Sequence, residues 1–117
     1  MQEKKTKKVT VRFPKRLKSE MQNALVKSGY GLRGKSKWLA EAIQLFFKQS
    51  NFVELAEQGI DINQAELTEV EAFYLDPATS EIVKTASIDI RKKHPLFEGV
   101  QSALIRSAVI YRLMLGK

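Results

Sequence analysis

The sequence of 117 residues contains no cysteine and a single histidine. Disulfides, thiolate nucleophiles and cysteine zinc sites are therefore excluded, and one histidine cannot build a histidine metal cluster. No apolar run approaches the roughly 18 residues that a membrane span needs, and no signal-peptide stretch follows the lysine-rich start. We expect a cytoplasmic chain with no membrane, metal or cofactor, organised as one small domain or two sharing a core.

Charge, by contrast, is abundant and unevenly distributed. The 20 basic residues exceed the 13 acidic ones, and the net charge of +7 suits a partner rich in phosphate. Residues 1–50 hold 13 basic and 3 acidic groups, residues 51–84 hold 1 and 8, and residues 85–117 hold 6 and 2. This pattern predicts two basic binding halves joined by an acidic connector.

The first basic segment is predicted to form a strand and two helices. Residues 8–13 alternate polar and apolar side chains, which is typical of a half-buried strand. Pro14 can open an amphipathic helix that ends at Gly29, and Ser36 is the predicted N-cap of a second helix. An apolar stripe on that second helix predicts core residues: Trp38, Leu39, Ala42, Ile43, Phe46 and Phe47.

The rest of the chain is predicted to hold a connector and a second strand. A short helix over residues 51–58 is followed by a hairpin, with Asp76-Pro77 as the turn between residues 70–75 and 81–90. Residues 85–90 alternate again and predict a strand, after which Ser102 caps a last helix. Residues 36–43 align with residues 102–109 as an internal repeat.

Strand, proline, amphipathic helix, glycine turn and serine-capped helix over residues 8–48 resemble the ribbon-helix-helix family of the Arc, MetJ and CopG repressors. This resemblance implies an α+β, mainly α fold in which two units form a pseudo-dimer around a two-stranded antiparallel ribbon, as in tandem members such as TraY. Residues 1–50 would be unit 1 with a basic N-terminal arm, residues 51–84 the acidic connector, and residues 85–117 a degenerate unit 2.

The second unit departs from the family pattern. Pro14 and Ser36 are 22 positions apart, but Pro95 and Ser102 only 7, so the first helix of unit 2 should shrink to about one turn. The helix over residues 51–58 would fill the gap. Alternatively, the N-terminal strands pair between two chains and residues 85–117 form something else.

The resemblance also implies a ribbon in the major groove of DNA, where each base pair presents a distinct pattern of donors and acceptors. Affinity would come from backbone N–H groups at helix starts and from nearby lysines. The implied base contacts are Lys8, Thr10, Arg12, Thr85, Ser87 and Asp89. Asp89 has alternative roles in rejecting other sequences or pairing with Arg12. The implied phosphate contacts are Lys4, Lys5, Lys7, Lys35, Ser36, Lys37 and Ser102.

Residues 29–36 also match the phosphate-loop pattern GxxxxGK[ST]. Such a loop must follow a buried strand in a parallel sheet, whereas helix is predicted here and the chain is too short for that sheet. We therefore expect no enzyme, and a DNA phosphate rather than a nucleotide at this turn.

These patterns predict sequence-specific binding of double-stranded DNA by a prokaryotic protein. It would act as a transcriptional repressor or as an accessory protein of plasmid conjugation, transfer or partition. The chain would be a pseudo-dimeric monomer or a homodimer, cooperative on tandem sites. The alternative is an antitoxin-like protein whose acidic connector binds a partner protein while its basic half binds DNA.

Overall fold

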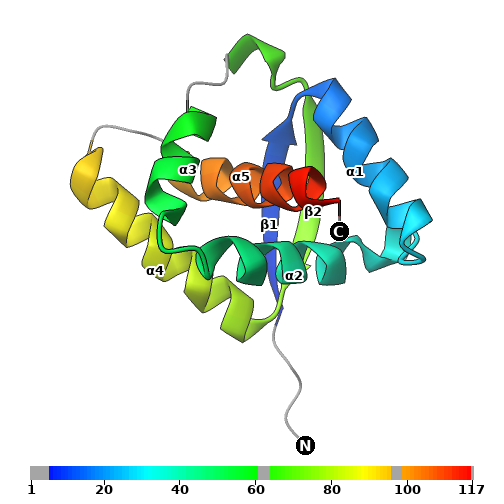
Figure 1. Cartoon of the computed structure of the whole chain (residues 1–117), viewed down its shortest axis with the longest axis horizontal. Helices are drawn as coiled ribbons and strands as arrows, with labels where there is room; N and C mark the ends of the chain where they lie inside the picture. The colour runs from blue at the N-terminus through cyan, green and yellow to red at the C-terminus, as the bar shows by residue number, and fades with distance from the viewer. Residues whose placement is uncertain (1–5, 61–63, 96–98, 117) are drawn as a thin grey trace, which may run out of the picture.

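The computed structural model of the chain describes residues 6–60, 64–95 and 99–116. The elements in these ranges are β1 (Lys7–Phe13), α1 (Lys15–Lys27), η1 (Leu32–Gly34), α2 (Lys35–Phe47), α3 (Phe52–Ile60), η2 (Gln64–Glu66), β2 (Glu69–Leu75), α4 (Pro77–Lys93) and α5 (Val100–Leu115). This is a small, mainly helical α+β fold in which the order strand, helix, helix occurs twice (Figure 1). No helix in the described ranges is long and apolar enough to cross a membrane.

The two strands form an antiparallel sheet within the one chain. Every residue of β1 has a partner in β2, from Lys7 opposite Leu75 to Phe13 opposite Glu69. Side chains alternate across a strand, so one face of the sheet carries the buried residues. They are Val9, Val11, Phe13, Phe73 and Leu75. The predicted two-stranded ribbon is present, but its second strand is residues 69–75.

Helices α2 and α5 pack against each other and cross the buried face of the sheet (Figure 1). The apolar stripe predicted on α2 is confirmed as core, with Phe47 at its half-buried end. The buried positions on α2 are Trp38, Leu39, Ala42, Ile43 and Phe46, and the matching ones on α5 are Leu104, Ile105, Ala108, Val109 and Arg112. The repeat seen in the sequence is therefore a repeat of core positions.

Arg112 occupies the one polar position in this matched set. Its guanidinium donates to the carbonyl oxygen of Trp38 at 2.7 Å and to the carboxylate of Glu41 at 3.1 Å, and it lies 4.7 Å from the Trp38 ring centroid. The Tyr30 hydroxyl donates to the same carboxylate. The bond from Tyr30, with help from Arg112, holds the pKa of Glu41 below its ordinary value. This cluster joins α2 to α5.

Helix α4 contradicts the prediction of a strand over residues 85–90. Asp76 is the N-cap of α4, its carboxylate accepts from the backbone N–H of Thr79 at 3.4 Å, and Pro77 is the first helical residue. Asp-Pro therefore starts a helix here and not a hairpin turn. The 17 residues of α4 bury a face at helical spacing, whereas Ile88 is 50% exposed. The alternation over residues 85–90 predicted a strand, but it lies within a longer pattern of helical spacing, and the longer pattern determines the structure.

The second run of strand, helix and helix is therefore β2, α4 and α5. With 17 residues, α4 is longer than the 13-residue α1, so the expectation of a shortened first helix is wrong. The expected boundary between residues 84 and 85 falls inside α4. The short helix predicted over residues 51–58 is confirmed as α3, which packs on α5 without replacing a missing helix.

The predicted serine N-caps are also wrong. Gly34 precedes α2 and Gly99 precedes α5, and neither helix start has a side-chain cap. Ser36 and Ser102 lie one and two residues inside their helices. Gly99 has a φ of 72°, a left-handed conformation that glycine adopts without steric cost.

Candidate nucleic-acid interface

The sheet face opposite α2 and α5 carries two rows of side chains. In β1, Lys8, Thr10 and Arg12 are exposed. In β2, Val70 and Tyr74 are 53% and 52% exposed, and Ala72 between them is half-buried. The register sets Lys8 opposite Tyr74, Thr10 opposite Ala72, and Arg12 opposite Val70. We call these six residues the outer face.

The outer face combines hydrogen-bonding and apolar chemistry. A guanidinium such as that of Arg12 can donate two bonds to guanine O6 and N7, and a lysine or threonine can bond base edges. Apolar side chains such as Val70 and Ala72 can contact the methyl group of thymine, and a tyrosine offers a ring and a hydroxyl. A two-stranded ribbon fits into the major groove, so both rows could reach base edges together.

Three of the six predicted base contacts lie where the prediction placed them. Lys8, Thr10 and Arg12 share the outer face, whereas the other three predicted residues are in α4. The sequence predicts a strand over residues 70–75, but only as one arm of a hairpin. The signal that could have identified the correct second strand is shared by both: each ends in a large apolar residue shortly before a proline, as Phe13-Pro14 and Leu75-Asp76-Pro77.

Thr85, Ser87 and Asp89, which were predicted to contact bases from a strand, lie in α4 and have different neighbours. The Ser87 hydroxyl donates to the backbone carbonyl of Val83 at 2.8 Å, a bond within the helix. Thr85 and Asp89 are exposed and line a groove of about 540 Å³ with Phe47 and Phe52. Asp89 does not pair with Arg12, since the ion pairs among the described residues do not include it.

Two glutamates of β2 form ion pairs with lysines of α1 and α2 beside the sheet. The Glu71 carboxylate lies 2.9 Å from Lys35 Nζ and 3.1 Å from Lys18 Nζ, and Glu69 lies 3.7 Å from Lys18 Nζ. Burial alone would raise the pKa of Glu71, but the bonds from Lys35 and Lys18 outweigh it and hold the pKa below its ordinary value. Lys35, a predicted phosphate contact, is thus engaged within the chain.

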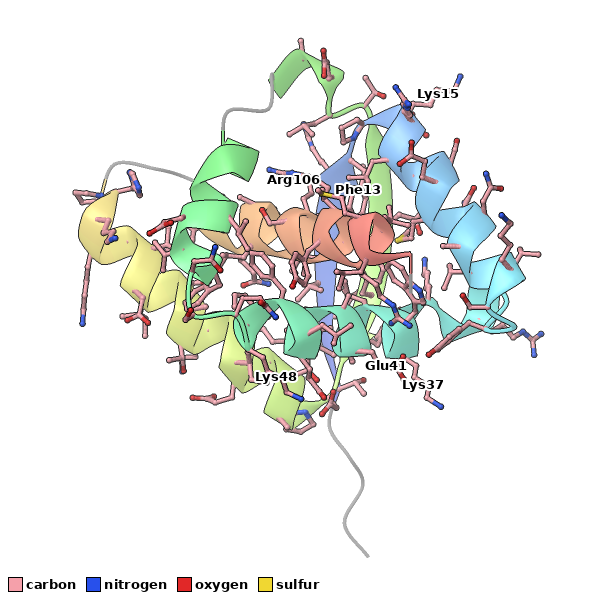
Figure 2. All side chains as sticks on the ribbon, in the orientation of Figure 1. Phe13, Lys15, Lys37, Glu41, Lys48 and Arg106 are labelled. Carbon is pink, nitrogen blue, oxygen red and sulfur yellow. The ribbon has the colours of Figure 1, made fainter. Side chains whose placement is uncertain are left out.

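The other predicted phosphate contacts are spread over several elements. The Ser36 hydroxyl accepts from the backbone N–H of Tyr74 at 3.0 Å, which ties β2 to the start of α2. Lys37 is exposed in the first turn of α2, near Glu41 (Figure 2). Lys7 is exposed at the start of β1, and Ser102 is half-buried in α5. Lys4 and Lys5 lie outside the described residues.

Arg106 supports the outer face from behind, a role that the sequence did not indicate. This α5 residue is 4% exposed, and its guanidinium donates to the backbone carbonyl of Arg12 at 3.0 Å. Figure 2 shows Arg106 beside Phe13 where α5 crosses β1. Burial lowers the pKa of Arg106. The contact fixes the backbone that presents the Arg12 side chain.

Residues 29–36, which match the phosphate-loop pattern, connect α1 to α2 through η1. Gly29, the first glycine of the pattern, and Gly31, at one of its variable positions, have φ values of 79° and 66° and serve the reversal between two helices. The residues before this turn form α1 and not the strand that a nucleotide-binding loop requires. Among the described residues, no group of three or more histidine and acidic side chains gathers to hold a metal ion.

Comparison of the chain with known protein families, with curated protein sequences and with solved structures gave no match. The arrangement of the outer face and its surroundings therefore carries the functional argument.

Proposed function

We propose that this protein binds double-stranded DNA in a sequence-specific manner, by laying the outer face in the major groove as a single-chain tandem ribbon-helix-helix protein. One observation carries the proposal. A solvent-exposed two-stranded ribbon presents Lys8, Thr10 and Arg12 on a chain of net charge +7, while its other face is held rigid by a helical core.

The repeated order of elements supports the tandem arrangement. β1, α1 and α2 are followed, after α3, by β2, α4 and α5, and the two strands pair with each other. A ribbon of this family needs two strands, and here one chain supplies both. The proposed DNA complex therefore needs one protein chain for each ribbon.

The outer face also favours a target that is not palindromic. Exchange of the two strands by a two-fold rotation about the Thr10–Ala72 pair would place Val70 on Lys8 and Tyr74 on Arg12. These residues differ in charge and size, so the two ends of the ribbon cannot read the same base pairs. A homodimeric ribbon would instead present identical ends, and its operator would be a palindrome.

Repression and an accessory role in plasmid transfer or partition would use the same contacts, so both remain within the proposal. The antitoxin-like alternative receives less support from the acidic segment. Glu69 and Glu71 face Lys18 and Lys35 of the same chain, and Asp76 caps α4, so these groups serve internal contacts.

The proposal is tested by selecting duplexes from a random library with the wild-type chain and measuring affinity for the selected duplex and a scrambled one. We expect an asymmetric consensus and a clear preference for the selected duplex. The double variant Lys8→Ala/Arg12→Ala should lose this preference. The matched control, Lys27→Ala/Lys48→Ala, removes two exposed charges outside the outer face and should keep it.

Failure to enrich any duplex would refute sequence-specific DNA binding. Equal affinities of the double variant and the control for the selected duplex would refute the role of the outer face, even if the chain bound DNA.

A further inference from the structure

A basic pocket lies at the end of the ribbon, between α4 and the start of α5. Its volume is about 280 Å³. The polar lining comes from three elements: Lys7 of β1, Ser80, Lys84, Ser87 and Arg91 of α4, and Gln101 of α5. The apolar floor includes Leu75 and Val83. Three cations and the neutral donors of Ser80 and Gln101 thus surround one hollow.

The basic and acidic residues of α4 that line hollows lie on different sides of the helix. Ser80, Lys84, Ser87 and Arg91 follow a spacing of four, three and four residues, so they share one face and line this pocket. Glu81 and Asp89 lie on the other side of α4, where they line the apolar groove beside Phe47. The acidic residues of the helix are therefore turned away from the three cations.

The cations of the pocket have no acidic partner within residues 6–60, 64–95 and 99–116. Among the residues that the structure describes, the ion pairs do not include Lys7, Lys84 or Arg91. The Ser80 hydroxyl and the Gln101 amide supply further hydrogen-bond donors. Like charges facing a common hollow repel each other, and an anion between them would relieve that repulsion.

The corresponding place at the other end of the ribbon, where β2 begins beside α1 and α2, has its charges paired within the chain. Counting from the first residue of each strand matches Lys7 with Glu69 and Ser80 with Lys18, and the core repeat matches Gln101 with Lys35. There, Lys18 and Lys35 bind Glu69 and Glu71 at 2.9 to 3.7 Å. There, β2 supplies counter-charges to the lysines of α1 and α2, whereas the described residues supply none to the three cations of the pocket, where an external anion can take that role.

We propose that this pocket is an anion site that takes one phosphate group, held by Lys7, Lys84 and Arg91. Arginine forks and lysine ammonium groups are the side chains that proteins use for phosphate oxygens. On the proposed function, on which this part rests, the ligand is a backbone phosphate of the DNA beside the ribbon. A free phosphorylated molecule offers the same chemistry.

The test compares the wild-type chain with Lys84→Gln/Arg91→Gln and with a matched control, Lys92→Gln/Lys93→Gln. The control removes the same charge from exposed positions of the same helix outside the pocket. Circular dichroism checks folding, and Lys84→Glu provides a second variant with a stronger expected effect. Each protein is titrated with the selected duplex at several salt concentrations and, separately, with inorganic phosphate.

We expect the pocket variant to bind all duplexes more weakly, with a salt slope lower by about one unit because one phosphate is no longer neutralised. The control should keep the wild-type slope. If the pocket variant and control bind DNA alike but only the pocket variant loses inorganic phosphate binding, the site stands and its ligand is a free phosphorylated molecule.

Phosphate binding in a chain that binds no duplex would refute the proposed function and leave the anion site standing. Equal behaviour of the pocket variant and the control in both titrations would overturn the anion site.

Discussion

The first half of the molecule, β1 to α2, and the second half, β2 to α5, share an order of elements and a buried pattern but differ in surface. Trp38 and Leu104 hold matching core positions, whereas Lys8 and Val70 hold matching places on the ribbon. Packing requires complementary apolar faces from both halves, and solvent-facing positions have no such constraint. The comparison teaches that the repeat is present in the core and absent from the solvent-facing positions of the ribbon.

The largest effect is expected from matched core truncations. Trp38→Ala should lower the free energy of unfolding by about 3–5 kcal/mol and Leu104→Ala by about 2–5 kcal/mol, because both side chains are fully buried. Urea denaturation measures both, with the exposed Ile88→Ala as a control expected to change stability by less than about 0.5 kcal/mol. A Leu104→Ala effect as small as the control would show that the halves do not share one core.

The next effect concerns the two ends of the ribbon. On the selected duplex, Arg12→Ala should cost about 1–3 kcal/mol of binding free energy and relax specificity at one base pair. Tyr74→Ala, the position exchanged with Arg12 by the two-fold rotation, should change a different base pair. Affinity measurements on a set of single-base-pair variants distinguish the two. Uniform weakening on all duplexes by Arg12→Ala would assign that residue to a phosphate.

A smaller effect should distinguish the starts of α1 and α4. Asp76→Ala should lower the free energy of unfolding by about 1 kcal/mol, because the Thr79 backbone N–H loses its acceptor, while Asp76→Asn should retain most of the stability. α1 begins after Pro14, which has no capping side chain, so the first half has no corresponding carboxylate to lose. Thermal unfolding of both variants provides the measurement. Equal losses in both would argue against a capping role.

The smallest effect is a pH dependence at the contact between the halves. The folded-state pKa of Glu71 lies below its ordinary value of 4.5, so its ion pairs stabilise the fold above that pH. The contribution, about 1 kcal/mol or less, should be lost as the pH falls through the lower folded-state pKa. Urea denaturation between pH 7 and pH 3 should show a weaker acid dependence for Glu71→Gln than for the wild-type chain. Parallel curves would show that the pairs contribute nothing.

Local patterns in the sequence predicted the first half well. The alternation before Pro14, the helical spacing up to Gly29 and the aromatic stripe of α2 each lie within one element, so neighbouring residues suffice to identify them. For the second half, the prediction was wrong at residues 85–90, where a short alternation typical of a strand lies within a longer helical pattern. That error moved the predicted base contacts from β2 to α4, and with them half of the candidate site.

Contacts between distant residues could not be predicted. The bond from Lys35 to Glu71 joins residues 36 positions apart, and that from Arg106 to the Arg12 carbonyl spans 94 positions. Such pairs depend on how the helices cross the sheet, which no local pattern specifies. The grouping of three cations in the pocket could not be predicted for the same reason, because β1 and α4 meet only in the folded chain.

The pairing of β1 with β2 in one chain also has a consequence for dilution. Two separate chains that share a ribbon come apart as their concentration falls, whereas strands joined by a linker meet at an effective concentration that dilution does not change. The ribbon of this protein should therefore stay assembled at any protein concentration, however few copies are present. A single substitution would alter one end of that ribbon and leave the other as it was.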